Sequence, residues 1–271
     1  MRLSTTLLLA CLTLVAVLRA QDVHAGDQFR ISEPEKREIE RKANQGDPQA
    51  MYQFAQLQPF ESCKEWWRRA ANLGYAPAQM QIAMLEEPNQ LNRAKSREEK
   101  KLANQQFRNR LTPIFKALQD GATGGDLEAM FMLGASDSYF SKWGIAKEME
   151  CFFWLRKAGE LGHPKAPLAL ACEFLESRKF NAAPQDAVEG FSWLRKATET
   201  GEFSSRVTAI IMLTRFYSYG SKAFAFKRDP KEAMKWANRG ATLEGISLED
   251  FFMTNGLQHP YQIKKEHVQF D

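Results

Sequence analysis

The chain has 271 residues, of which 44% are hydrophobic and 26% are charged, and 37 Lys and Arg against 33 Asp and Glu give a formal net charge of +4. This composition is that of a folded globular protein and excludes a disordered or fibrous chain. The charge is too weak to indicate a nucleic-acid-binding protein. The four cysteines are too few for a disulfide scaffold at this length.

The first 25 residues have the layout of a secretory signal peptide. Arg2 supplies the positive start, residues 3–18 are apolar and uncharged, and Ala25 ends a small-residue cleavage site. The apolar run is too short for a membrane span. We therefore expect cleavage near Ala25, a periplasmic or secreted mature protein, and no stable membrane span in its mature form. The alternative is a lipoprotein, because residues 8–11 resemble a lipobox ending at Cys11, but the apolar run continues beyond that cysteine.

A short pattern begins at four glycines along the chain. An alanine follows each glycine four positions later, and an apolar residue paired with a small one comes four positions after that. Residues with this spacing lie on one face of a helix. A glycine before such a helix fits the end of the preceding helix, where a positive φ is needed. The pattern therefore predicts tight turns between helices at Gly46, Gly74, Gly125 and Gly162.

Tryptophans mark a second helix in each repeat. Trp66, Trp154 and Trp193 each stand eight residues before a glycine, and Trp236 lies nine residues before Gly245. An alanine or glycine follows each tryptophan four positions later. Large residues against small ones at helical spacing allow two helices to approach closely. The predicted unit is therefore a helix, a loop, a second helix that carries the tryptophan, and a glycine turn.

Five such units, 28 to 51 residues long, follow a leading helix expected over residues 33–45. One helical hairpin cannot bury its own apolar face, whereas stacked hairpins share a continuous core. Strand patterns are absent. We therefore predict an all-α fold, a right-handed α-solenoid of about five hairpins over residues 26–245. Residues 246–271 are expected to form a C-terminal capping helix (247–253) and a tail.

Three segments resemble the Sel1-like repeats, a subclass of the tetratricopeptide-like helical repeats. They are WLRKAGELGHPKA at residues 154–166, WLRKATETG at 193–201 and DPKEAMKW at 229–236. The resemblance covers about residues 45–245 and implies a binding protein with no catalytic activity. Exported Sel1-like proteins of this size include immunity proteins against type VI secreted lipase effectors and periplasmic inhibitors of sensor kinases. It thus implies a periplasmic protein partner such as a secreted toxin; an envelope adaptor and a hydrolase are the alternatives.

No motif for catalysis, metal binding or phosphate binding occurs in the sequence. His163, His259 and His267 lack metal-ligand spacing. We therefore expect no enzymatic activity, no cofactor, no metal and no nucleic-acid partner. The cysteines of the mature chain are expected to pack as small hydrophobic residues, and a bridge between Cys151 and Cys172 is the alternative.

A charged insertion, residues 86–110, lengthens the second unit. It holds seven basic and four acidic residues. One interpretation is a solvated helix that extends the tryptophan-type helix, and the other is a basic arm that meets an acidic partner or anionic lipid headgroups. The candidate partner-binding residues here are Arg97, Lys100 and Lys101. A stripe that anchors the insertion is expected at Leu102, Phe107, Leu111 and Phe115.

Residues 215–228 form a long predicted loop in the last unit. Aromatic and basic residues alternate there around Gly220, which is the composition of binding hot spots. The alternative interpretation is that the aromatic side chains cover the end of the core. The candidate partner-binding residues of this loop are Arg215, Tyr217, Tyr219, Phe224, Phe226, Lys227 and Arg228.

Overall fold

The computed structural model describes residues 31–93, 96–147, 149, 152–176, 184–221, 224 and 226–263, except for the side chains at 60, 87–93, 138, 176, 184 and 185. The predictions of a signal peptide, of lipidation at Cys11 and of a bridge to Cys151 lie outside these residues. The described part forms thirteen α-helices and one short 3-10 helix, and its extended backbone is limited to a single bridge between Ser221 and Phe226. The predicted all-α solenoid is confirmed.

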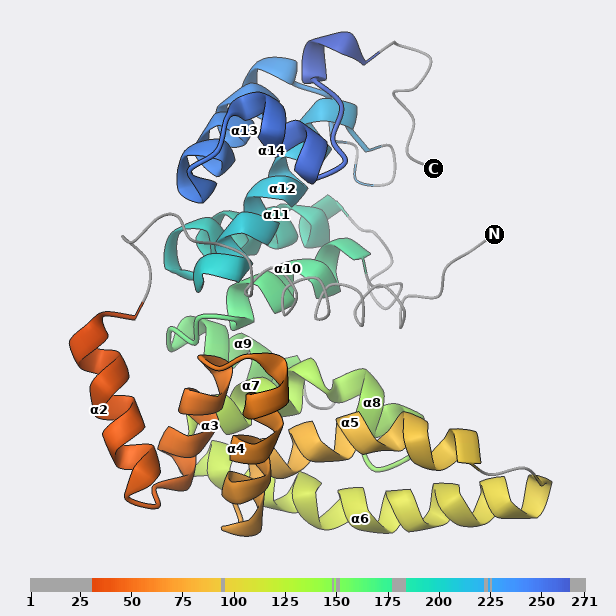
Figure 1. Ribbon diagram of the computed structural model, residues 1–271. Helices are drawn as coiled ribbons and strands as arrows, with labels where there is room; N and C mark the ends of the chain where they lie inside the picture. The colour runs from red at the N-terminus through yellow and green to blue at the C-terminus, as the bar shows by residue number, and fades with distance from the viewer. Residues whose placement is uncertain are drawn as a thin grey trace. The chain divides into compact units, whose positions relative to one another are not determined.

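Residues 31–163 form one compact unit in which successive helices pack against each other. The predicted leading helix is the first of them and ends one residue earlier than expected. The helices, labelled in Figure 1, are α2 (Glu33–Asn44), α3 (Pro48–Gln56), α4 (Phe60–Asn72), α5 (Ala76–Arg93), α6 (Arg97–Thr123), α7 (Leu127–Ala135), α8 (Asp137–Lys142) and α9 (Phe152–Glu160).

The second compact unit comprises the residues from Pro164 onward. Its long helices also pair with their neighbours in the sequence, and α14 packs on α13 as the predicted capping helix. The elements are α10 (Ala166–Glu176), α11 (Pro184–Thr200), α12 (Phe203–Tyr219), α13 (Pro230–Glu244), α14 (Leu248–Thr254) and the 3-10 helix η2 (Pro260–Gln262).

The predicted glycine turns share one hydrogen-bonding arrangement. At Gly46 the glycine N–H donates to the Ala43 carbonyl at 3.1 Å, and the next N–H, of Asp47, donates to Lys42 at 3.2 Å. Gly46 has a φ of 97°, which an L-residue with a side chain rarely adopts. This is the Schellman ending of a helix. The same pair of bonds and a positive φ recur at Gly74, Gly125, Gly162 and Gly245, which confirms the turn prediction there.

Gly201 departs from this arrangement, because its φ lies outside the positive range. The residues after it also lack the alanine that follows the other turn glycines. Here the carbonyl of Thr198, close to the end of α11, accepts hydrogen bonds from Arg206 Nε and Arg239 Nη2, both at 3.1 Å. Two arginine side chains therefore satisfy the helix end that a Schellman turn satisfies elsewhere.

Small residues lie where the helices approach closely, as the tryptophan spacing predicts. Ala70, Ala158 and Ala197, each four residues after a tryptophan, are 0% exposed. At the corresponding Gly240, a Cβ atom would come within 2.4 Å of the Phe251 ring. Cys63 is buried in the same way and serves as a small apolar side chain.

Candidate protein-binding surfaces

The charged insertion forms most of a long helical hairpin. Residues 86–93 extend α5, and α6 begins at Arg97 after a capping box in which Ser96 Oγ accepts from the Glu99 N–H at 3.0 Å. Figure 1 shows α5 and α6 side by side along this hairpin. The interpretation as a helix that extends the tryptophan-type helix therefore holds from Arg97 onward, whereas the first part of the insertion lengthens the preceding helix instead.

The anchoring stripe is confirmed at three of its four residues. Phe107, Leu111 and Phe115 are buried, and the Phe107 ring packs against Trp143 with 4.9 Å between centroids. The prediction is wrong for Leu102, which is 57% exposed. Leu102 lies more than one helical turn from Phe107, toward the end of the hairpin.

The basic residues of the insertion whose side chains the structure describes fall into two groups. Arg108 donates to the Gly144 carbonyl at 2.9 Å, and Arg110 forms an ion pair with Glu86, so both contribute to the internal structure. Arg97, Lys100 and Lys101 are exposed, and their side chains have no hydrogen bond or ion pair with any residue of the described ranges. We call these three residues the basic tip.

The position of the basic tip is unfavourable for the helix that carries it. Its members lie in the first two turns of α6, where the positive end of the helix dipole disfavours cations. Their spacing of three and four residues places them on neighbouring positions of one helical face. The adjacent Glu98 offsets part of the charge, while Glu99 is engaged in the capping box. Because the three cations of the basic tip do not stabilise the helix that carries them, they are available to bind a partner.

The second candidate surface is shorter than predicted. Tyr217 and Tyr219 belong to the last turn of α12, which ends at Tyr219, so the loop itself begins at Gly220. The prediction that these tyrosines lie in a loop is wrong, because α12 continues for a full turn beyond Arg215. A Cβ at Gly220 would lie 2.9 Å from the Phe226 carbonyl, so glycine allows the chain to fold back tightly here.

The aromatic side chains of this segment pack against one another. Phe226 stacks on Phe191 at 4.4 Å, and Tyr217 meets the edge of Phe226 at 4.9 Å. Phe216 and Phe224 pack against the same core cluster. This packing agrees with the interpretation that these aromatic residues cover the core. A partner-binding role for Tyr217, Tyr219, Phe224 and Phe226 stays a prediction.

The basic residues of this segment differ in what they contact. Arg215 and Lys227 are exposed. Arg228 donates to the Pro260 carbonyl and so fastens η2 to the end of the loop. Arg195, which the sequence analysis did not single out, donates to the Tyr217 hydroxyl at 2.8 Å. Arg215 and Lys227 are therefore the candidates of this segment with the most solvent-facing charge.

A Lys or Arg side chain lies over the ring of each repeat tryptophan, a contact that the sequence analysis did not predict. The basic group lies 4.7 Å from the ring centroid for Arg69 over Trp66 and 5.3 Å for Arg239 over Trp236. Lys157 and Lys196 cover Trp154 and Trp193 in the same way. The signal was a Lys or Arg three residues after each of these four tryptophans. Such pairs contribute about 0.5–1 kcal/mol each at exposed sites, so the tryptophans are structural.

A buried polar cluster lies inside the first unit. The Tyr52 hydroxyl donates to Glu128 Oε1 at 2.9 Å, and His163 Nε2 lies 3.0 Å from the other oxygen of that carboxylate. The His163 ring stacks on Phe131 at 4.3 Å. Tyr52 is 2% and His163 4% exposed, so the cluster ties α3, α7 and the end of α9 together rather than facing a substrate. No metal-binding group of His, Cys, Asp or Glu occurs among the residues that the structure describes.

Two tyrosines of this region make stability sensitive to high pH. Burial and then the Glu128 carboxylate raise the pKa of Tyr52 well above its ordinary value, and burial with the carboxylates of Asp126 and Glu128 raises the pKa of Tyr75. Above about pH 10 the unfolded chain releases these protons while the folded protein retains them. The stabilisation that these two tyrosines contribute is therefore complete below about pH 10. It is lost as the pH rises above this value, by up to about 1.4 kcal/mol per pH unit for each tyrosine.

Urea unfolding at pH 8, 10 and 11 measures this effect. We expect the Tyr52→Phe, Tyr75→Phe double variant to lose less stability between pH 8 and 11 than the unchanged protein. Tyr261→Phe, at a side chain that is 63% exposed, is the matched control and is expected to keep the original pH dependence. Identical pH dependence in all three proteins would contradict the prediction.

Antiparallel helices joined by glycine turns and interlocked by tryptophans and small residues define a helical-repeat solenoid protein. Four regions of the chain, residues 60–75, 127–163, 168–201 and 209–244, match the Sel1 repeat. The chain belongs to the Sel1-repeat family, whose members are in general protein-binding scaffolds. Within the described ranges, the helices are all too short or too polar to cross a membrane.

Two solved structures are similar to the chain. The crystal structure of c5321, a protective antigen of uropathogenic Escherichia coli with an SLR fold, is 22% identical with a TM-score of 0.45, over 87% of this chain and 46% of that one. A Sel1 repeat protein from Oxalobacter formigenes is 17% identical with a TM-score of 0.40, over 94% of this chain and 66% of the other. The chain thus spans about half the length of the first. No curated protein matches the sequence significantly.

Proposed function

We propose that this chain is a non-catalytic protein-binding solenoid that acts outside the cytoplasm and inhibits its partner by covering it. The observation that carries the proposal is the basic tip, because Arg97, Lys100 and Lys101 are exposed at the end of a long hairpin and unpaired within the described ranges. The signal-peptide-like start of the sequence supports the location. The general role of Sel1 repeats as protein-binding scaffolds supports the class of function.

The particular function we propose is that of an immunity protein against a type VI secreted lipase effector. In this mechanism the basic tip pairs with carboxylates beside the active cleft of the toxin, and the body of the solenoid occludes the cleft. Complementary charge of this kind accelerates association and orients the partner, while the apolar contacts at the centre hold the complex. The alternatives are an envelope adaptor or a regulator of a sensor kinase.

A pull-down with the full mature chain from the envelope fraction, read by mass spectrometry, tests the proposal. An immunity protein is expected to retain one tightly bound lipase, and a strain that lacks the gene is expected to die under attack by that toxin. An adaptor would retain several partners of modest affinity. Normal survival of the deletion strain under attack would contradict the immunity role.

Charge reversal at the basic tip is expected to weaken binding of the captured partner by roughly 10- to 100-fold, mainly through slower association at low salt. The variant is Arg97→Glu, Lys100→Glu, Lys101→Glu, and association rates measured at two salt concentrations give the result. The control reverses three other exposed cations of the same unit, Arg37, Arg68 and Lys116. Equal affinity of the two triple variants would show that the tip does not bind the partner.

A further inference from the structure

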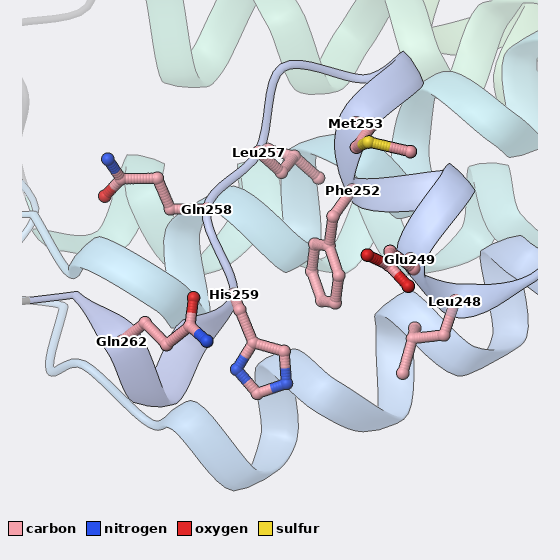
Figure 2. Close-up of a pocket in the computed structure, with 8 residues that line it drawn as sticks. All are labelled: Leu248, Glu249, Phe252, Met253, Leu257, Gln258, His259 and Gln262. Carbon is pink, nitrogen blue, oxygen red and sulfur yellow. The ribbon is translucent and has the colours of Figure 1, made fainter.

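The C-terminal cap of the second unit contains a groove. It lies between α14 and residues 257–262, has a volume of about 710 Å³ and is lined by eight residues. Figure 2 shows the Phe252 ring in the middle of this group, with His259 and Gln262 on one side and Leu248 and Glu249 on the other. Binding pockets in proteins have volumes of this size, about 300–1,000 Å³.

The cap has two different faces. Phe251 is 0% exposed and packs against Gly240 and Ile210, as expected of a helix that closes a solenoid. The Leu257 N–H donates to the Phe252 carbonyl at 2.9 Å, and this bond holds the chain after α14 beside the groove. Phe252 thus belongs both to the core cluster of the cap and to the lining of the groove.

The side of the cap that lines the groove exposes more apolar surface than the terminal face of a solenoid normally does. A terminal repeat normally presents a polar face, because no further repeat covers it. Here Met253 is 67% exposed, and it lines the groove together with the buried Phe252 and Leu257. Unbranched methionine adapts to ligands of different shape. Apolar side chains in this arrangement favour an occupant that brings an apolar side chain of its own.

The polar residues of the groove indicate the remaining chemistry of this occupant. Gln258 and Gln262 are exposed, and their side-chain amides have no hydrogen bond to a residue of the described ranges, so they are available to the N–H and C=O groups of a peptide backbone. Glu249 is exposed at the edge and forms no ion pair with a described residue. Since it is the one carboxylate of the lining, it complements a cation.

We propose that this groove binds a short peptide segment of a partner protein, with an apolar side chain against Leu248, Phe252 and Leu257 and an adjacent lysine or arginine beside Glu249. The inference rests on the proposed function, because it assigns a second contact surface to a protein-binding solenoid. The groove carries a carboxylate, whereas the basic tip carries cations. The groove therefore selects a basic segment of the partner, and the tip selects an acidic one.

Methyl NMR of the full mature chain tests the proposal, with the Met253 methyl signal assigned by its loss in Met253→Leu. The probes are three peptides in one Gly-Ser frame, with Lys-Leu-Lys, Glu-Leu-Glu or Lys-Ser-Lys at the centre. We expect the Lys-Leu-Lys peptide to shift the Met253 signal with saturation, the Glu-Leu-Glu peptide to bind roughly threefold to fivefold more weakly, and the Lys-Ser-Lys peptide to leave the signal unchanged.

Two variants complete the test. Glu249→Lys, at an exposed position, is expected to reverse the preference in favour of the Glu-Leu-Glu peptide, and Leu248→Asp is expected to abolish binding of the Lys-Leu-Lys and Glu-Leu-Glu peptides. Glu199→Lys, an exposed position on α11, is the control and keeps the original preference. An unchanged preference in Glu249→Lys, or no Met253 shift with any peptide, overturns the proposal.

Two further outcomes separate this inference from the proposed function. A Met253 signal that moves when the protein alone is diluted would mean that a second copy of the chain fills the groove, and this also overturns the proposal. If Glu249→Lys and Leu248→Asp both capture the envelope partner as well as the unchanged protein does, the groove is not a contact surface while the proposed function stands.

Discussion

Replacing Gly134 with alanine is expected to lower the free energy of unfolding by about 3 kcal/mol. Gly134 lies on α7 where this helix packs against α9. A Cβ atom there would come within 2.2 Å of Leu155 Cβ and within 2.4 Å of its backbone nitrogen. Because the obstacle includes the backbone of a residue that is 0% exposed, a side-chain rotation cannot relieve it. The two helices must separate, and the contacts around Leu155 are lost.

Thermal unfolding measures this loss, which corresponds to a fall in the melting temperature of about 6–12 °C. Gly124→Ala is the matched control, because Gly124 has a φ of −72° and a Cβ there would have no neighbour closer than 3.4 Å. The control is expected to stay within about 1 kcal/mol of the unchanged protein. Equal melting temperatures for the two variants would mean that α7 and α9 are not as close as this packing requires.

Replacing Glu128 with alanine is expected to cost about 2–4 kcal/mol. The carboxylate accepts the hydrogen bond of the Tyr52 hydroxyl and contacts His163, and both of these side chains are buried. Without it, two buried polar groups lose their contact with the carboxylate. The Asp126 side chain still accepts hydrogen bonds from the backbone N–H groups of residues 128 and 129, so the start of α7 remains capped.

Urea unfolding at pH 8 gives the magnitude. Glu160→Ala, at an exposed glutamate of the same unit, is the control and is expected to change stability by less than about 0.5 kcal/mol. The Tyr52→Phe variant with and without Glu128→Ala completes a double-mutant cycle, and direct contact predicts a coupling energy of about 1 kcal/mol. Strictly additive effects would exclude an energetic interaction between the two side chains.

Features of the fold that have a local cause could be predicted from the sequence. The glycine turns and the helices between them depend on the φ preference of glycine and on the 3.6-residue period of apolar residues. Both can be recognised within a short stretch of sequence. The predictions were wrong for Leu102 and for Tyr217 and Tyr219, because the burial of Leu102 and the end of α12 depend on which distant segments cover them. The Glu128 cluster was missed for a similar reason, since Tyr52 and His163 lie 76 and 35 residues away from Glu128 along the chain.

The sequence by itself therefore determined the order of helices and turns, and the small residues at the helix contacts. The reason is that one αα unit recurs, and its glycine, alanine and tryptophan positions repeat with it. Only the tertiary structure decided that Arg108 and Arg110 are bound internally, while the side chains of the basic tip are unpaired among the residues that the structure describes. It also decided that the cap has a groove on its second face. Charge pairing and exposed apolar surface depend on which distant segments come into contact, and a repeat pattern does not encode this.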